Sequence, residues 1–246
     1  WTITEENFMK NLRDKHIIDM LKFRASYGEI GDDNLGDPFD SSRRWLYMNQ
    51  WAYGGNTVMD LDHTNSIYTW YRQNTLGNKD VKWETVKKTN FGIDYGFLGG
   101  LITGSLDFFC DRRNDILIFG DNRSIPSYFG TTAPTINKGK VRTSGYELEL
   151  KLNKKFANGI RLWGNINMTH AKNKVLLKDD AQLTPNYQKE AGYSMGQYHS
   201  YIDRGFINDI DDLIGSPAHE SNDNHRLVGD YYIVDFNGDG VVDSKD

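Results

Sequence analysis

The sequence has 246 residues, of which 38% are hydrophobic and 26% are charged, and this balance excludes an intrinsically disordered chain. Its net charge of −5 excludes a nucleic-acid-binding protein, because no basic surplus is available to displace counterions from phosphates. The single cysteine, Cys110, excludes an intrachain disulfide framework. Its 14 Tyr, 12 Phe and 24 Gly against 5 Pro favour strands joined by turns.

The first segment of the chain favours a short helix or helical turn over residues 5–15. Thr4 is placed to cap it, and Glu5 and Glu6 would fall in its first turn, where carboxylates stabilise helices. No signal-peptide pattern precedes it. No apolar run reaches the roughly 18 residues of a membrane-spanning helix, but barrel strands escape this criterion because their polar and apolar residues alternate.

Five later segments show the two-residue alternation of apolar and polar side chains that indicates β-strands. They cover residues 21–28, 90–97, 105–111, 146–152 and 161–168. The fourth alternates most regularly, with one face made of Tyr146, Leu148, Leu150 and Leu152. We expect the apolar faces to contact lipid and the polar faces to line a lumen. The expected lumen residues are Lys22, Arg24, Asn90, Asp94, Asp107, Glu147, Glu149, Arg161 and Asn165.

The connections between these segments alternate in length. They are long over residues 30–82, short over 98–104, long over 116–142, short over 153–159, and long after the last segment. In an antiparallel meander all long connections then lie at one end, as in outer-membrane barrels with long extracellular loops and short periplasmic turns. Five strands cannot close such a barrel, so we expect further strands outside this sequence.

Five collinear stretches carry recognisable motifs. Residues 21–28 read LKFRASYG, and residues 83–97 read WETVKKTNFGIDYGF. Further on, residues 104–109 read GSLDFF, residues 137–148 include NKG and TSGYEL, and residues 229–243 include GD and DFNGDGVVD. In this order they resemble motifs of the SusC/RagA type of TonB-dependent outer-membrane transporter. Thr85 and Ser144 depart from the pattern, which commonly has Lys at the first position and Asn or Lys at the second.

The resemblance implies that residues 1–246 are part of one all-β domain, a large antiparallel transmembrane β-barrel of about 22 strands around a plug domain. It implies a bacterial outer membrane location, a SusD-like surface lipoprotein as a lid, and energy supplied through TonB. The implied function is nutrient import without enzymatic activity, and glycan is favoured over peptide as the ligand. The plug and the TonB-contacting segment are expected outside this sequence. Outer-membrane lipid is an expected partner, and no organic cofactor is expected.

Residues 172–246 are expected to form a long extracellular loop region that ends in an EF-hand-like loop at residues 235–246. The ligand positions would be Asp235, Asn237, Asp239, Val241, Asp243 and Asp246. Alternate residues of a tight loop can converge on a hard cation, which Val241 would contact through its carbonyl, and Gly240 permits the sharp turn. The spacing predicts a structural Ca²⁺ site of roughly millimolar affinity. The alternative is a carboxylate-rich turn ordered by hydrogen bonds without metal.

The first long connection is rich in aromatic side chains, which stack on sugar rings or anchor peptides. The candidate substrate-binding residues are Trp45, Tyr47, Trp51, Tyr53, Trp70 and Tyr71. Alternatively, these rings pack the loop onto itself or belong to an interfacial girdle. No catalytic residue is predicted, because the sequence contains no P-loop or H-E-x-x-H pattern.

A soluble, secreted β-sandwich that binds carbohydrate and holds calcium at residues 235–246 is the alternative function. Its strands would bury the same apolar faces against a second sheet. The barrel alone explains why the long connections gather at one end.

Overall fold

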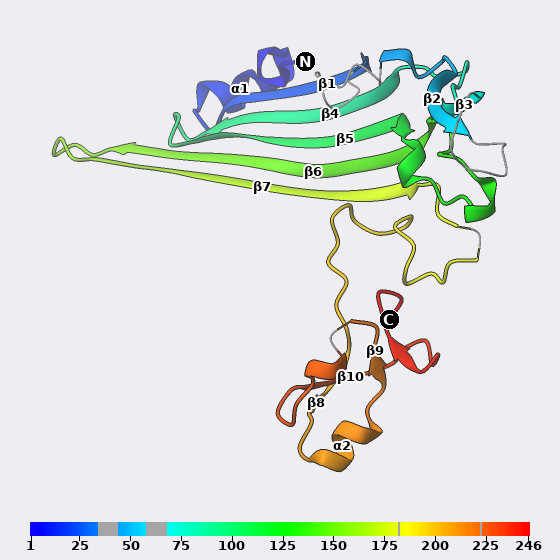
Figure 1. The fold of residues 1–246 in the computed structure, drawn as a ribbon. Helices are drawn as coiled ribbons and strands as arrows, with labels where there is room; N and C mark the ends of the chain where they lie inside the picture. Colours follow the sequence, from blue (N-terminus) through cyan, green and yellow to red (C-terminus); the bar gives the residue numbers. More distant parts are fainter. Residues whose placement is uncertain (34–43, 58–67, 182, 222) are drawn as a thin grey trace. The chain divides into compact units, whose positions relative to one another are not determined.

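The computed structural model describes residues 1–33, 44–57, 68–181, 183–221 and 223–246. It divides into two units, one formed by residues 1–185 with 189–195 and the other by residues 186–188 with 196–246. Figure 1 shows the first unit as a long, curved antiparallel sheet with the strand order β1-β4-β5-β6-β7. Its strands are β1 (Ile18–Asp32), β4 (Glu84–Phe97), β5 (Ile102–Ile118), β6 (Ile136–Lys155) and β7 (Arg161–Leu177). The all-β class and the five predicted strands are confirmed, although each strand is longer than its alternating segment.

The register brings the alternating apolar residues together. In one row across the sheet, Phe23 pairs with Ile93, Ile93 with Leu106, Leu106 with Leu148 and Leu148 with Met168. Directly paired residues lie on the same face of an antiparallel sheet, so the rows form one apolar belt. We define this belt by Leu21, Phe23, Ala25, Phe91, Ile93, Tyr95, Phe97, Leu106, Phe108, Tyr146, Leu148, Leu150, Leu152, Ile166 and Met168.

No second sheet covers the apolar belt within the described part of the first unit. Phe91, Phe108 and Ile166 remain 43%, 46% and 56% exposed. An uncovered apolar surface of this extent is characteristic of a protein that meets a nonaqueous environment. This observation argues against the soluble β-sandwich, which must bury the same side chains.

The lengths of the connections are as the sequence predicts. β4 and β5 are joined through Leu98, Gly99 and Gly100, which all have positive φ angles of 57°, 66° and 78°. β6 and β7 are joined by a turn over residues 156–160, in which Gly159 has a φ of 85°. The long connections between β1 and β4, between β5 and β6, and after β7 lie at the opposite end of the sheet. Two 3-10 helices, η4 (Gly120–Asn122) and η5 (Ser127–Phe129), lie between β5 and β6.

The N-terminal segment contains a short helix within residues 5–15, as predicted, but the prediction that Thr4 caps it is wrong. The segment forms η1 (Ile3–Glu5), η2 (Asn7–Met9) and the short helix α1 (Lys10–Asp14). Thr4 lies inside η1, is 1% exposed, and accepts a hydrogen bond from the Leu21 N–H of β1 at 3.4 Å through its hydroxyl. This hydroxyl therefore attaches the segment to the sheet and does not cap a helix.

Two further features differ from the sequence prediction. The connection after β1 contains a hairpin of β2 (Gln50–Thr57) and β3 (Tyr68–Thr75), which the alternation did not indicate. The region expected to be loop from residue 172 begins later, because β7 remains paired with β6 up to Leu177. The additional paired residues lengthen the sheet at the end where the long connections lie.

The second unit is small and loop-rich. It contains β8 (Asp203–Phe206), α2 (Ile210–Gly215), β9 (Ala218–His219), η6 (Asp223–His225), β10 (Tyr231–Ile233) and β11 (Val241–Val242). β10 pairs with β8 in antiparallel fashion and β11 with β9 in parallel fashion. Asp209 caps α2 by accepting a hydrogen bond from the Asp212 N–H at 2.9 Å. Among the described residues of the chain, no helix is both long and apolar enough to cross a bilayer.

Candidate functional site

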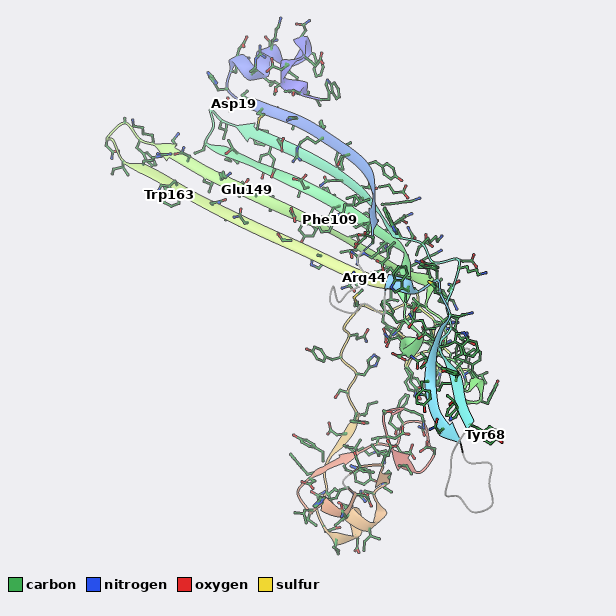
Figure 2. All side chains as sticks on the ribbon, turned by 45° about the horizontal axis from the view of Figure 1, so that its top comes forward. Asp19, Arg44, Tyr68, Phe109, Glu149 and Trp163 are labelled. Carbon is green, nitrogen blue, oxygen red and sulfur yellow. The ribbon has the colours of Figure 1, made fainter. Side chains whose placement is uncertain are left out.

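The polar face of the sheet holds the residues that were expected to line a lumen. The register places all nine of them on the face opposite the apolar belt, which confirms that they share one surface. Figure 2 shows side chains projecting along the sheet, with Phe109 on β5 and Glu149 on β6 labelled. That this surface faces a lumen stays a prediction.

An ion-pair group lies on this polar face across three strands. The Arg24 guanidinium of β1 donates to Asp94 of β4, with an Nη2–Oδ1 distance of 2.8 Å, and to Asp107 of β5, with an Nη2–Oδ2 distance of 2.9 Å. The two carboxylate side chains are only 22% and 16% exposed. Hydrogen bonds between charged groups are among the stronger polar contacts of a protein, so this group couples the three strands.

The Arg24 side chain can reach Asp107 because Gly92 has no side chain. Gly92 is the residue of β4 that lies directly between them in the register. A Cβ atom on Gly92 would lie 2.4 Å from Asp107 Oδ1 and 2.8 Å from Arg24 Cζ. Glycine is therefore required here because the guanidinium crosses β4 over its backbone. This contact gives a physical reason for a glycine two residues before Asp94.

The aromatic candidates fall into three places. Trp51 and Tyr53 lie on one face of the β2–β3 hairpin, where Tyr71 pairs with Tyr53 and their ring centroids are 6.1 Å apart. Trp70 lies on the other face and packs over Gly54, whose added Cβ would lie 2.4 Å from the indole. Trp45 and Tyr47 precede the hairpin and contact each other with centroids 6.1 Å apart. Figure 2 labels Tyr68 at the far end of this hairpin.

Only part of the aromatic set therefore forms one surface. Trp51, Tyr53 and Tyr71 are 66%, 59% and 65% exposed, and we call them the aromatic face. Trp70 packs on its own hairpin, as the alternative of internal packing expects. The sequence could not make this division, because it depends on the pairing of β2 with β3.

Asn137 fixes the end of the first long connection to the sheet. Its amide oxygen accepts from the Lys82 N–H at 2.9 Å, and its Nδ2 donates to the carbonyls of Lys82 and Asp115, each at 2.7 Å.

Asp179, which is 9% exposed, forms ion pairs with Arg123 at 3.0 Å and with Lys138 at 2.5 Å, and so joins the segment after β7 to the connection between β5 and β6 and to β6 itself. Burial raises the pKa of the Asp179 carboxyl, but the hydrogen bonds from these two cations outweigh it and hold the pKa below its usual value.

Replacing Asn137 by alanine is expected to loosen residues 78–83. Loss of its three backbone hydrogen bonds should cost about 2 kcal/mol of local stability, equivalent to roughly 30-fold faster amide exchange in this segment. Hydrogen exchange of the whole protein measures the change. Asn165→Ala is the control, since Asn165 is an exposed asparagine of β7 with no side-chain hydrogen bond to the described residues. Equal exchange in the two variants would contradict the tether.

The predicted calcium loop is held by backbone hydrogen bonds. Asp235 accepts from the N–H groups of Gly238 at 2.6 Å and Gly240 at 2.7 Å. Asp246 accepts from the N–H groups of Phe236 and Asn237 at 2.9 and 3.1 Å, which brings the two ends of the loop together. Among the described residues, no group of three or more His, Cys, Asp or Glu is placed to hold a metal. The geometry matches the alternative of a turn ordered without metal, and calcium stays a prediction.

This loop should lose order in acid. Amide hydrogen bonds, first from Asp243 and then from Asn237, lower the pKa of Asp246, and hydrogen bonds from Lys245 lower that of Asp243. A folded pKa below the unfolded value of about 3.9 means that the stabilisation is present above that pH and is lost as pH falls through the folded pKa. Hydrogen exchange of residues 235–246, corrected for intrinsic rates, should show this transition.

Asp246→Asn is expected to remove the Asp246 part of this acid transition.

The calcium prediction has its own measurement on the same loop. Ca²⁺ at roughly millimolar concentration should slow amide exchange of the wild-type loop. Exchange that is independent of both acid and Ca²⁺ would contradict the assigned hydrogen bonds and the calcium prediction together.

The comparisons with known proteins agree with this architecture. A sequence family described as "TonB dependent receptor-like, beta-barrel" matches residues 12–240. "TonB-dependent receptor P39" of Formosa agariphila is 31% identical over 83% of this chain and 18% of its own length. "TonB-dependent receptor SusC" of Bacteroides thetaiotaomicron is 28% identical over 100% of this chain and 23% of its own length.

The fold also matches a solved barrel. The structure of the RagAB peptide importer in the closed-closed state has a TM-score of 0.57 and 19% identity over 86% of this chain and 23% of that chain. This chain spans about a fifth of the length of the curated relatives. The matched residues include all five strands of the sheet with its uncovered apolar belt. The chain therefore belongs to the TonB-dependent receptor-like β-barrel family of the outer membrane, and its likeness to SusC and to the RagAB structure agrees with the SusC/RagA resemblance; its described residues include a sheet of five barrel strands.

Proposed function

We propose that the whole protein imports a nutrient across the outer membrane, and that this chain supplies part of its barrel wall and its surface loops. In this proposal a SusD-like lipoprotein covers the long-loop end and TonB supplies energy through a part outside this chain. The family and the names of the relatives, which include SusC, support the proposal. The chain's own part is structural and ligand-contacting and involves no catalysis.

We propose a glycan as the cargo, and the aromatic face of the β2–β3 hairpin carries this proposal. Trp51, Tyr53 and Tyr71 present exposed rings on one surface at the long-loop end. The apolar faces of sugar rings pack against aromatic rings, and rigid aromatic side chains lose little conformational entropy on binding. Three neighbouring rings therefore suit an extended oligosaccharide better than a small ion.

A peptide is the second candidate cargo. The solved relative with the same fold is described as a peptide importer. A peptide would be recognised through its backbone as well as its side chains, and the two-stranded β2–β3 sheet offers strand edges for such pairing.

The test uses the purified whole protein with the aromatic face removed as Trp51→Ala, Tyr53→Ala and Tyr71→Ala combined. Affinity for neutral oligosaccharides should fall roughly tenfold or more, equivalent to at least about 1.4 kcal/mol. Tyr128→Ala is the control, because Tyr128 is an 89% exposed aromatic residue on a different loop. Unchanged oligosaccharide affinity in the triple variant would overturn the glycan proposal. Selective loss of binding to short peptides would support the second candidate.

A further inference from the structure

A row of cations crosses the sheet beyond the apolar belt, at the end where the long connections lie. Lys87 of β4 pairs with Arg112 of β5, Arg112 with Arg142 of β6, and Arg142 with Lys174 of β7. Arg112 lies four positions after Phe108, and Arg142 lies four positions before Tyr146, so these cations share the face of the belt. We call these four residues the basic row.

The basic row carries charge that the described residues leave largely unpaired. Arg112, Arg142 and Lys174 are exposed, and among the described residues no carboxylate lies within ion-pair distance of them. Lys87 has one distant partner, Glu29, at 3.9 Å. Lys172 on β7 adds a further exposed cation to the same face.

Some cations of the opposite face form ion pairs with carboxylates. Arg24 contacts Asp94 and Asp107, and Lys88, the neighbour of Lys87, lies 3.6 Å from Asp111. Lys22 and Arg113 of the polar face also have no carboxylate within ion-pair distance among the described residues, so pairing alone does not separate the two faces. The basic row differs because four adjacent strands each contribute a cation at the same level of one face. This grouping of charge points to a partner on the belt side.

The distance between the basic row and the apolar belt gives the level in the membrane at which the row lies. Residues rise about 3.3 Å along a strand, so the row lies about 13 Å beyond the Phe91–Phe108–Tyr146 row of the belt. When the belt lies in hydrocarbon, a surface at that distance toward the long loops lies at the level of the outer headgroups. Lysine and arginine at that level attract anionic headgroups.

We propose that the basic row binds the phosphate groups of an anionic lipid in the outer leaflet. Adjacent strands are about 4.8 Å apart, so neighbouring guanidinium and ammonium groups can reach the oxygens of one phosphate together. The two central residues are arginines, whose planar donors match phosphate in a bidentate geometry. The site depends on the barrel standing in the outer membrane and is independent of the cargo it imports.

The test compares two double variants of the whole protein in detergent. Arg112→Gln with Arg142→Gln neutralises the centre of the basic row. Lys88→Gln with Arg113→Gln is the matched control, because these residues are sequence neighbours of the row on strands β4 and β5 but lie on the opposite face. Heat-modifiable migration on gels checks that both variants form barrels.

The probes are phosphorylated lipid A, the same lipid A after enzymatic removal of phosphate, and inorganic phosphate alone, with binding measured by native mass spectrometry. Phosphorylated lipid A should bind the wild type and the control alike and bind the Arg112/Arg142 variant roughly tenfold or more weakly. Equal binding of dephosphorylated lipid A would overturn the proposal. Inorganic phosphate that binds as tightly as the lipid would also overturn it, since the site would then recognise free phosphate. Equal loss in the control variant would assign the effect to net charge and reject the row.

Discussion

Replacing Ile166 by arginine is expected to cost about 2–4 kcal/mol of folding free energy in a bilayer. Ile166 lies in the apolar belt, pairs with Leu150 and is 56% exposed. In water an exposed arginine would be tolerated at this position. In a membrane its guanidinium must leave water for hydrocarbon, which is unfavourable near the midplane. The measurement is folding of the whole protein into lipid vesicles across a urea series.

Asn167→Arg is the matched control for this experiment. Asn167 is the next residue of β7, is also exposed, and lies on the polar face opposite Glu149. The same substitution there should change the folding free energy by less than about 1 kcal/mol, because a polar surface accepts an added cation. Similar costs at residues 166 and 167 would show that neither face contacts hydrocarbon.

Replacing Gly92 by alanine is expected to cost about 2–3 kcal/mol through loss of the hydrogen bonds that join Arg24 and Asp107. The added Cβ would lie 2.4 Å from Asp107 Oδ1, so the carboxylate or the guanidinium must move. Asp107 Oδ1 is already buried without a hydrogen-bond partner. Displacing Arg24 also removes the hydrogen bond to Asp107 Oδ2, so less of the cost of burying this carboxylate is offset. Urea-dependent folding of the whole protein gives the cost.

Gly28→Ala is the control for Gly92→Ala. Gly28 lies on the same polar face of the neighbouring strand β1, and an added Cβ meets no atom within 4 Å. Alanine there should be neutral or stabilise the protein by up to about 1 kcal/mol, because it restricts the unfolded chain. In an Arg24→Ala background the cost of Gly92→Ala should shrink. An undiminished cost there would show that the strain lies in the backbone of β4.

The sequence predicted the five strands of the sheet because alternation is a local property. In β6, the alternate residues Tyr146, Leu148 and Leu150 define an apolar face, and this pattern is visible without knowing which strands pair with β6. The β2–β3 hairpin escaped prediction because Trp70 and Tyr71 are consecutive bulky aromatics that occupy opposite faces. A pattern that is apolar on both faces has no two-residue period to detect.

The groups that carry the candidate sites depend on register, which the sequence does not reveal. Arg24 lies 70 residues from Asp94 and 83 residues from Asp107 in the chain. It reaches Asp107 only because the pairing of the strands places Gly92 between them. The basic row is likewise assembled from four strands. Thr4 illustrates the same limit, since a typical helix-capping residue instead bonds to β1 through a contact between distant residues.

The unpaired edge of β7 determines whether residues 1–246 stay in solution when they are produced alone. Residues 192–195 form hydrogen bonds with β7 only at Asn173 and Val175. The part of β7 that precedes Asn173 has no neighbouring strand on that side among the described residues. Unsatisfied amide and carbonyl groups along an exposed edge strand recruit other strands. Expressed alone in water, residues 1–246 should therefore stack edge to edge into insoluble fibrils that bind thioflavin.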